Sequence, residues 1–119
     1  RNFTYVDDIV DATLLAAQKI ENGTAINAGT SDFNSIYDVA QLVCNMIGHI
    51  PEKGFSFSQS KPTGPFHRAA DVSRGKILLG WQPKISLEEG LKKTIAWYLK
   101  NMGDQTFHQE DLERRLMVR

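Results

Sequence analysis

Three basic residues are the strongest candidates for chemistry in this sequence. Arg1 precedes an expected strand, while Lys61 and Arg68 lie in a loop rich in glycine and proline, 59–70. The planar guanidinium of arginine can hold two phosphate oxygens at once, so three cations together could clamp a diphosphate. The alternative is that each is a solvated surface charge. Composition and spacing do not decide between these two roles.

Other potentially reactive groups give weaker indications of a functional site. The three histidines lack the spacing of metal ligands, and the Asp7-Asp8 pair stands where an expected strand meets a helix, which favours capping over acid–base catalysis. Neither G-x-G-x-x-G nor G-x-x-x-x-G-K-[ST] occurs, so the backbone cradles for dinucleotides and triphosphates are absent from the sequence. We therefore expect no metal site, no catalytic residue and no cofactor bound by this chain alone.

Size and charge restrict the class of protein. The chain has 119 residues, enough for one small domain, and its 14 basic and 14 acidic side chains cancel, which gives no reason to expect nucleic acid or an anionic membrane as a partner. A single cysteine is typical of a reducing compartment, so we expect a cytoplasmic protein. No apolar run approaches the roughly 18 residues of a membrane span.

Apolar periodicity and capping residues predict four helices. Asp8 is expected to cap the first, which should end before Asn22-Gly23, and Asp71 should cap the third. Two serines followed three positions later by an acidic residue resemble capping boxes and predict the second and fourth helices, which should end at Gly48 and before Gly103. Three segments read as short strands: 3–6, 24–28 and 55–58.

These elements predict an α/β domain in which three or four short strands alternate with four helices. We place the domain at residues 1–103 and expect residues 104–119 to form a tail that is either a loosely docked helix or disordered. A complete doubly wound nucleotide-binding fold would need more strands and a glycine-rich turn after the first. The sequence therefore predicts a smaller α/β unit.

Three segments of the chain resemble a known family. The opening "RNFTYVDDIVDA" is similar to the R-D-F-x-Y-V-D-D-x-x-x-A segment of extended short-chain dehydrogenase/reductases, the NAD-dependent nucleotide-sugar epimerases and dehydratases such as UDP-glucose 4-epimerase. Residues 64–98 resemble the later R-x-x-A-D-x-x-K-x-x-x-x-L-G-W-x-P segment, and "AINAGTSDFNSIYDVAQLV" resembles the N-x-G and helix between them. The order and spacing match over residues 1–102.

The resemblance implies a particular place in the enzyme. In this family such segments form the C-terminal substrate-binding portion, after a Rossmann domain that holds NAD or NADP and a catalytic Tyr-x-x-x-Lys pair. The tyrosines here are followed four positions later by Ile9, Gln41 and Met102, so the pair is absent from the sequence. We therefore expect a fragment that is not catalytic alone, a view that the absence of an initial methionine favours, and a homodimer when the enzyme is whole.

The resemblance also assigns roles to the three cations. Arg1 corresponds to a family arginine that contacts the substrate diphosphate. Relatives place a phosphate-binding arginine either ten or three residues before the aspartate that matches Asp71, and these positions hold Lys61 and Arg68. Lysine lacks the planar fork, so Arg68 is the better match. Gly64 replaces an aspartate that contacts the ribose in some relatives.

Two functions follow as hypotheses. The first is the nucleotide-sugar-binding portion of an epimerase or dehydratase, with a UDP-, dTDP- or GDP-sugar as substrate and the absent Rossmann domain as partner. The second is a stand-alone, non-catalytic module that binds nucleotide sugars or associates with another protein. A reading frame that extends upstream of Arg1 would favour the first.

Overall fold

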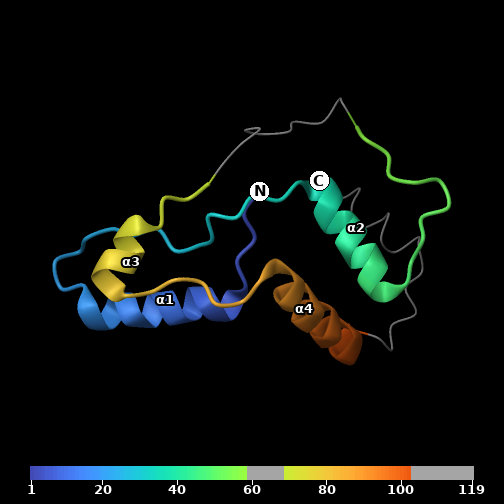
Figure 1. Ribbon diagram of the computed structural model, residues 1–119. Coiled ribbons are helices and arrows are strands. Elements are labelled where there is room, and N and C mark those ends of the chain that lie inside the picture. The colour runs from blue at the N-terminus through green and yellow to red at the C-terminus, as the bar shows by residue number, and fades with distance from the viewer. Residues whose placement is uncertain (59–68, 103–119) are drawn as a thin grey trace.

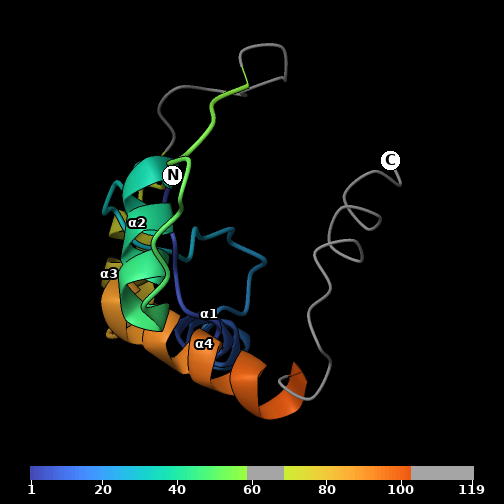
Figure 2. The same ribbon diagram turned by 90° about the vertical axis from the view of Figure 1, so that its right-hand side faces the viewer.

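The computed structural model describes residues 1–58 and 69–102, which contain four helices. These are α1 (Val6–Lys19), α2 (Ile36–Ile47), α3 (Ser73–Leu79) and α4 (Leu87–Met102). Helix α1 packs against α3, and α2 packs against α4 (Figures 1 and 2). The predicted number and order of helices are confirmed for this part of the chain.

The predicted strands were wrong, because the described residues contain helices and irregular segments but no strand. A strand is defined by backbone hydrogen bonds to a neighbouring strand, and the amino-acid pattern alone cannot supply that neighbour. One reciprocal pair exists: the main-chain N–H of Asn34 donates to the Arg1 carbonyl at 3.0 Å, and the Arg1 nitrogen donates to the Asn34 carbonyl at 2.7 Å. A single such pair does not make a ladder.

The two aromatic residues of segment 55–58 lie beside α2. Phe55 and Phe57 both contact the ring of Tyr37 on α2, with ring centroids 5.4 Å and 5.9 Å from it. Residues two apart in an extended chain point to the same side. Phe57 is nevertheless 73% exposed, so the half-buried strand that the sequence predicted is not formed.

Capping serines and terminal glycines mark several of the helix ends. The hydroxyl oxygen of Ser35 accepts from the Asp38 main-chain N–H at 3.0 Å, and that of Ser86 accepts from the Glu89 N–H at 3.2 Å. Both predicted capping boxes are thus confirmed at the serine. Helices α2 and α3 end at glycines with left-handed backbone, Gly48 at φ 68° and Gly80 at φ 67°, which is the conformation that glycine adopts at least cost.

The start of α1 differs from the prediction. The helix begins at Val6, and the residue before it, Tyr5, has extended backbone and forms no side-chain cap. Asp8 lies inside the first turn and is 3% exposed. Its two carboxylate oxygens accept the main-chain N–H groups of Lys84 at 3.1 Å and Ile85 at 3.0 Å. Asp8 therefore does not cap its own helix but anchors the turn that leads into α4.

The core lies between α1, α3 and the turn after α3. Ala12, Leu79 and Trp81 are 1%, 2% and 4% exposed, and Leu15, Ala16, Ile20 and Ile26 pack around them. The ammonium group of Lys19 donates to the Leu79 carbonyl at 2.8 Å, which satisfies one of the free carbonyls at the end of α3. Trp81 thus lies in the core, whereas the other tryptophan, Trp97 on α4, is 62% exposed.

Candidate functional site

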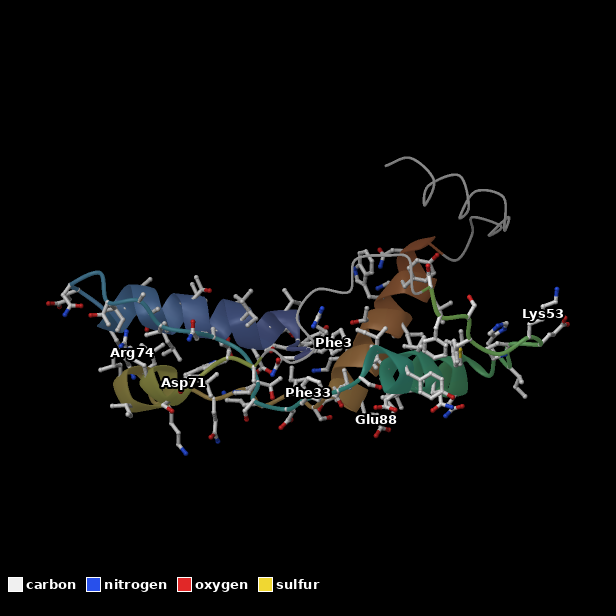
Figure 3. All side chains as sticks on the ribbon, turned by 90° about the horizontal axis from the view of Figure 1, so that it is seen from above. Phe3, Phe33, Lys53, Asp71, Arg74 and Glu88 are labelled. Atoms are coloured by element: carbon white, nitrogen blue, oxygen red, sulfur yellow. The ribbon has the colours of Figure 1, made fainter. Side chains whose placement is uncertain are left out.

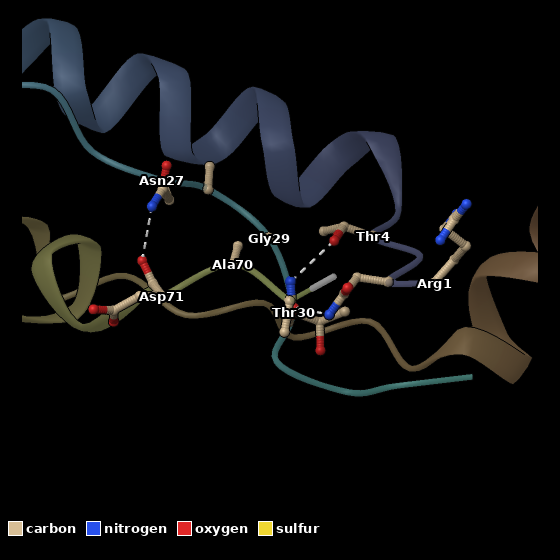
Figure 4. Close-up of a pocket in the computed structure, with 10 residues that line it drawn as sticks. Arg1, Thr4, Asn27, Gly29, Thr30, Ala70 and Asp71 are labelled. Carbon is tan, nitrogen blue, oxygen red and sulfur yellow. Dashed lines mark hydrogen bonds between the residues drawn. The ribbon is translucent and has the colours of Figure 1, made fainter. Parts of the chain in front are cut away.

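A cavity of about 460 Å³ lies where three irregular segments meet. Residues from the start of the chain, from the segment after α1 and from the approach to α3 line it (Figure 4): Arg1, Asn2, Thr4, Asn27, Ala28, Gly29, Thr30, Ala69, Ala70 and Asp71. This volume is within the range of about 300–1,000 Å³ that small-molecule sites occupy. The lining is rich in groups that can form hydrogen bonds.

Side-chain hydrogen bonds hold the first two segments together. The amide of Asn2 donates to the carbonyls of Thr30 at 2.8 Å and Asp32 at 3.0 Å. The hydroxyl oxygen of Thr4 accepts from the Thr30 main-chain N–H at 3.0 Å. These bonds satisfy backbone groups that a sheet would otherwise pair, so they fix the cavity wall without a strand. Sequence reasoning gave Asn2 and Thr4 no role here.

The third segment is tied in through Asn27 and Asp71. The Asn27 amide donates to the Asp71 carbonyl at 3.1 Å, and the Asp71 carboxylate accepts from the Ser73 N–H at 3.0 Å (Figure 4). Hydrogen bonds from the side chain and main chain of Ser73 hold the pKa of Asp71 below its ordinary value, and the charge of Arg74 lowers this pKa further. The N-cap position of α3 is Val72, which forms no side-chain cap, so Asp71, predicted to be the cap, stands one residue before that position although its carboxylate does accept from the first residue of the helix.

Of the three basic residues predicted to bind phosphate, Arg1 is the one that the described part of the structure places at the cavity. Arg1 lies at one end of the cavity and Asp71 at the other (Figure 4). Lys61 and Arg68 lie outside the described residues. Ala69, the next residue after Arg68 in sequence, lines the cavity. Among the described lining residues, Arg1 and Asp71 are the two with ionisable side chains, and these side chains have opposite charges.

Cofactor cradles are not found among the described residues. Four glycines there have positive φ: Gly23, Gly48, Gly54 and Gly80. Gly48 and Gly80 end helices, whereas a pyrophosphate cradle needs its glycines before a helix N-terminus, where N–H groups point at the anion. These residues do not fit a dinucleotide.

Residues 1–58 and 69–102 show neither a cluster of metal ligands nor a membrane-spanning helix. This part of the chain holds no group of three or more His, Cys, Asp or Glu side chains placed to bind a metal ion. None of its helices combines the length and apolar character that crossing a bilayer requires.

Known proteins resemble this chain over most of its length. UDP-glucuronic acid decarboxylase 1 of Xenopus tropicalis is 35% identical over 109 residues, which are 92% of this chain and 25% of the relative. GDP-L-fucose synthase 1 of Arabidopsis thaliana is 34% identical over 102 residues, 86% of this chain and 31% of the relative. No protein-family model matches the chain.

The solved structure of UDP-glucuronic acid 4-epimerase from Bacillus cereus, in complex with NAD, is similar as well, with a TM-score of 0.66 and 29% identity over 91% of this chain. This chain is a distant homologue of the extended short-chain dehydrogenase/reductases, the group of nucleotide-sugar epimerases and dehydratases. It spans between a quarter and a third of the length of these relatives, 25% to 33%. This homologue therefore corresponds to a portion of such an enzyme, and the family resemblance is confirmed.

Proposed function

We propose that this chain is the nucleotide-sugar-binding portion of an NAD(P)-dependent epimerase or dehydratase, and that it holds the diphosphate of a UDP-, dTDP- or GDP-sugar. The observation that carries this proposal is the alignment with nucleotide-sugar enzymes over 92% and 86% of the chain. The names of these two relatives refer to a UDP-sugar and a GDP-sugar, so we propose the class of ligand rather than one base.

The cavity suits this role through its size and its polar lining. The guanidinium of Arg1 can donate two parallel hydrogen bonds to phosphate oxygens at one end. The carboxylate of Asp71, which hydrogen bonds from Ser73 keep ionised by lowering its pKa, opposes an anion at the other end. Because the described lining includes one basic side chain and one acidic side chain, diphosphate binding would depend on Lys61 and Arg68 as well, which the resemblance assigns to phosphate.

The chemical steps would take place elsewhere in the whole enzyme. A nicotinamide cofactor would supply hydride transfer, and this chain would orient the sugar against it. The sequence contains no Tyr-x-x-x-Lys pair, and its described glycines do not form a dinucleotide cradle. We propose, from the family resemblance, that the whole enzyme is a homodimer.

Titration tests this proposal on the product of the complete reading frame. UDP-, dTDP- and GDP-sugars are titrated calorimetrically into the unmodified protein and into Arg1→Ala, Lys61→Ala and Arg68→Ala. Loss of a charged hydrogen bond should cost about 1.5–3 kcal/mol, roughly a 10- to 100-fold weaker affinity. Arg68→Ala should have the largest effect, and Arg68→Lys should recover part of it.

Lys53→Ala is the matched control, because this exposed lysine lies far from Asp71 (Figure 3). It should bind as the unmodified protein does. The proposal would be overturned if the unmodified protein bound none of the three sugar nucleotides. It would also be overturned if the Arg68→Ala and Lys53→Ala variants bound them with equal affinity.

A further inference from the structure

We propose that Asn22 is a site at which this chain modifies itself, through a cyclic imide that the nitrogen of Gly23 forms with the Asn22 side chain. Asn22 is the one asparagine of the sequence that precedes a glycine, and both residues are exposed in the turn after α1. Neither residue lines the cavity, so the proposal does not depend on the proposed ligand.

Thr24 holds the side-chain carbonyl of Asn22. Its hydroxyl donates to Asn22 Oδ1 at 2.6 Å, and its main-chain N–H donates to the same oxygen at 3.1 Å. An asparagine that bonds to the residue two positions on folds its side chain back over the peptide between them, which here is the Gly23 peptide. These bonds therefore turn Cγ of Asn22 toward the nitrogen that would attack it.

The Gly23 nitrogen is open to attack by a base from solvent. Within residues 1–58 and 69–102, no hydrogen bond involves its N–H. Glycine has no side chain, and no atom beyond its two chain neighbours lies within 4 Å of the position that a Cβ would take. Hydroxide can thus remove the proton, and no neighbouring group has to move aside when the ring closes.

The reaction needs only water and hydroxide. Hydroxide removes the Gly23 proton, and the nitrogen attacks Asn22 Cγ, so that a C–N bond forms and the carbonyl electron pair moves to Oδ1. Both Thr24 donors point at this oxygen, where the negative charge develops, as the donors of an oxyanion hole do. Collapse of the adduct expels Nδ2 as ammonia and leaves a five-membered imide. Water then adds to one imide carbonyl and breaks its C–N bond, which gives aspartate or isoaspartate.

The two products affect the fold differently. Aspartate keeps an oxygen acceptor for both Thr24 donors and adds a negative charge. Isoaspartate carries the main chain through the side-chain carbon, which lengthens the turn after α1. In the segment that follows, the Ala25 carbonyl accepts from Arg74 at 2.9 Å and Ile26 packs on the core. Isoaspartate should therefore loosen the contact between this segment and α3.

Ageing of the product of the complete reading frame tests the proposal. The protein is incubated in mildly alkaline buffer, and conversion of each asparagine is followed by peptide mass mapping that separates aspartate from isoaspartate. Asn27, which is also exposed outside the helices but precedes Ala28, is the internal control. Asn22 should be converted faster than Asn27, and hydroxylamine should trap the imide and cleave the chain between Asn22 and Gly23.

Two variants at position 24 isolate the role of the hydroxyl donor. Each rate in the native protein is divided by the rate of the same variant unfolded in guanidinium chloride, which removes the intrinsic effect of the side chain. Thr24→Val removes the hydroxyl but keeps the shape, so this ratio should fall about fivefold, the contribution of one neutral hydrogen bond. Thr24→Ser keeps the hydroxyl and should leave the ratio unchanged.

Three results would overturn the proposal. The first is conversion of Asn22 no faster than that of Asn27, and the second is no cleavage by hydroxylamine. The third is a ratio that stays the same or rises in Thr24→Val, because the Thr24 bonds would then anchor the amide rather than activate it. None of these results bears on the proposed ligand, whose titration relies on Arg1, Lys61 and Arg68.

Discussion

The two helix pairs of this chain are built from similar amphipathic sequences but reach different degrees of burial. Around α1 and α3, Ala12, Leu79 and Trp81 are almost completely buried. Helix α2, which packs on α4, has no buried residue, and its Ile36 and Ile47 are 62% and 52% exposed. An apolar stripe is thus necessary for a core but not sufficient, because an opposing surface must cover it.

Polar contacts between residues far apart in sequence are also found around α1 and α3, whereas the ion pairs of α4 are local. The α1 and α3 region is linked to distant segments by buried Asp8, by Lys19 and by Arg74, whose guanidinium donates to the Ala25 carbonyl at 2.9 Å. The ion pairs of α4, Lys92–Glu88 and Lys93–Glu89, join residues of one helix and are exposed. Such exposed pairs contribute little to stability. We therefore expect the α1 and α3 region to dominate the free energy of unfolding.

The largest expected effect compares the two tryptophans. Trp81→Ala should destabilise the chain by about 3–5 kcal/mol, because it leaves a cavity beside Leu79. Trp97→Ala should change the unfolding free energy by no more than about 0.5 kcal/mol, since Trp97 is 62% exposed. Urea unfolding followed by circular dichroism measures both. Similar losses in the two variants would contradict the contrast between the regions.

The next effect concerns Asp8, which connects the regions. Asp8→Asn keeps the size of the side chain but leaves one of the Lys84 and Ile85 N–H groups without an acceptor, which should cost about 1–3 kcal/mol. Exposed Asp7 serves as the matched control, and Asp7→Asn should cost about 0.5 kcal/mol or less. Amide hydrogen exchange at Lys84 and Ile85 should accelerate only in Asp8→Asn. Unchanged exchange there would mean that the carboxylate does not hold this turn.

A smaller effect tests the contact between Tyr5 and α4. A Cβ at Gly90 would come within 3.1 Å of Tyr5 Cδ2, so the ring must shift by a few tenths of an ångström. Gly90→Ala should gain about 1 kcal/mol of helix propensity and lose a similar or larger amount to this crowding. In a Tyr5→Ala background the same substitution should stabilise the chain. A double-mutant cycle by urea unfolding measures the coupling, and strictly additive effects would exclude the contact.

Local chemistry was predictable from the sequence where neighbours in the chain supply it. The capping serines Ser35 and Ser86 and the terminal glycine Gly48 act within one helical turn, and all three were predicted correctly. The prediction that Asp8 caps α1 was wrong, because the partners of its carboxylate are 76 and 77 residues away in sequence. The strand predictions failed for the same reason, since pairing depends on a second segment that the pattern does not specify.

In the candidate site, too, contacts between residues far apart in the sequence were not predictable. Arg1 is among the residues that line the cavity, and its contact with a diphosphate, which the family resemblance implies, stays a prediction. Asn2, Thr4 and Asn27 build the wall through bonds that span 28, 26 and 44 residues, and no local signal marks them. Lys61 and Arg68 remain predictions, because they lie outside the described residues.

The smallest expected effect lies at the start of α3, beside the cavity. Hydrogen bonds from Ser73 hold the pKa of Asp71 below its ordinary value of 3.8, and the charge of Arg74 is the weakest cause. Because folding favours the charged form, this contribution to stability is present above the ordinary pKa and is lost as pH falls through the lower, folded pKa. Acidification below about pH 4 should therefore loosen this end of α3.

Two variants rank the causes of this pKa. Ser73→Ala removes the side-chain hydrogen bond, and it should raise the pKa of Asp71 toward the ordinary value by more than Arg74→Ala does. An NMR titration of the Asp71 carboxyl carbon measures both shifts. A larger rise in Arg74→Ala would mean that charge, rather than the Ser73 cap, holds the carboxylate. The outcome also bears on the cavity, because hydrogen bonds that lower the pKa of Asp71 keep this residue negatively charged, and a negative charge opposes an incoming phosphate.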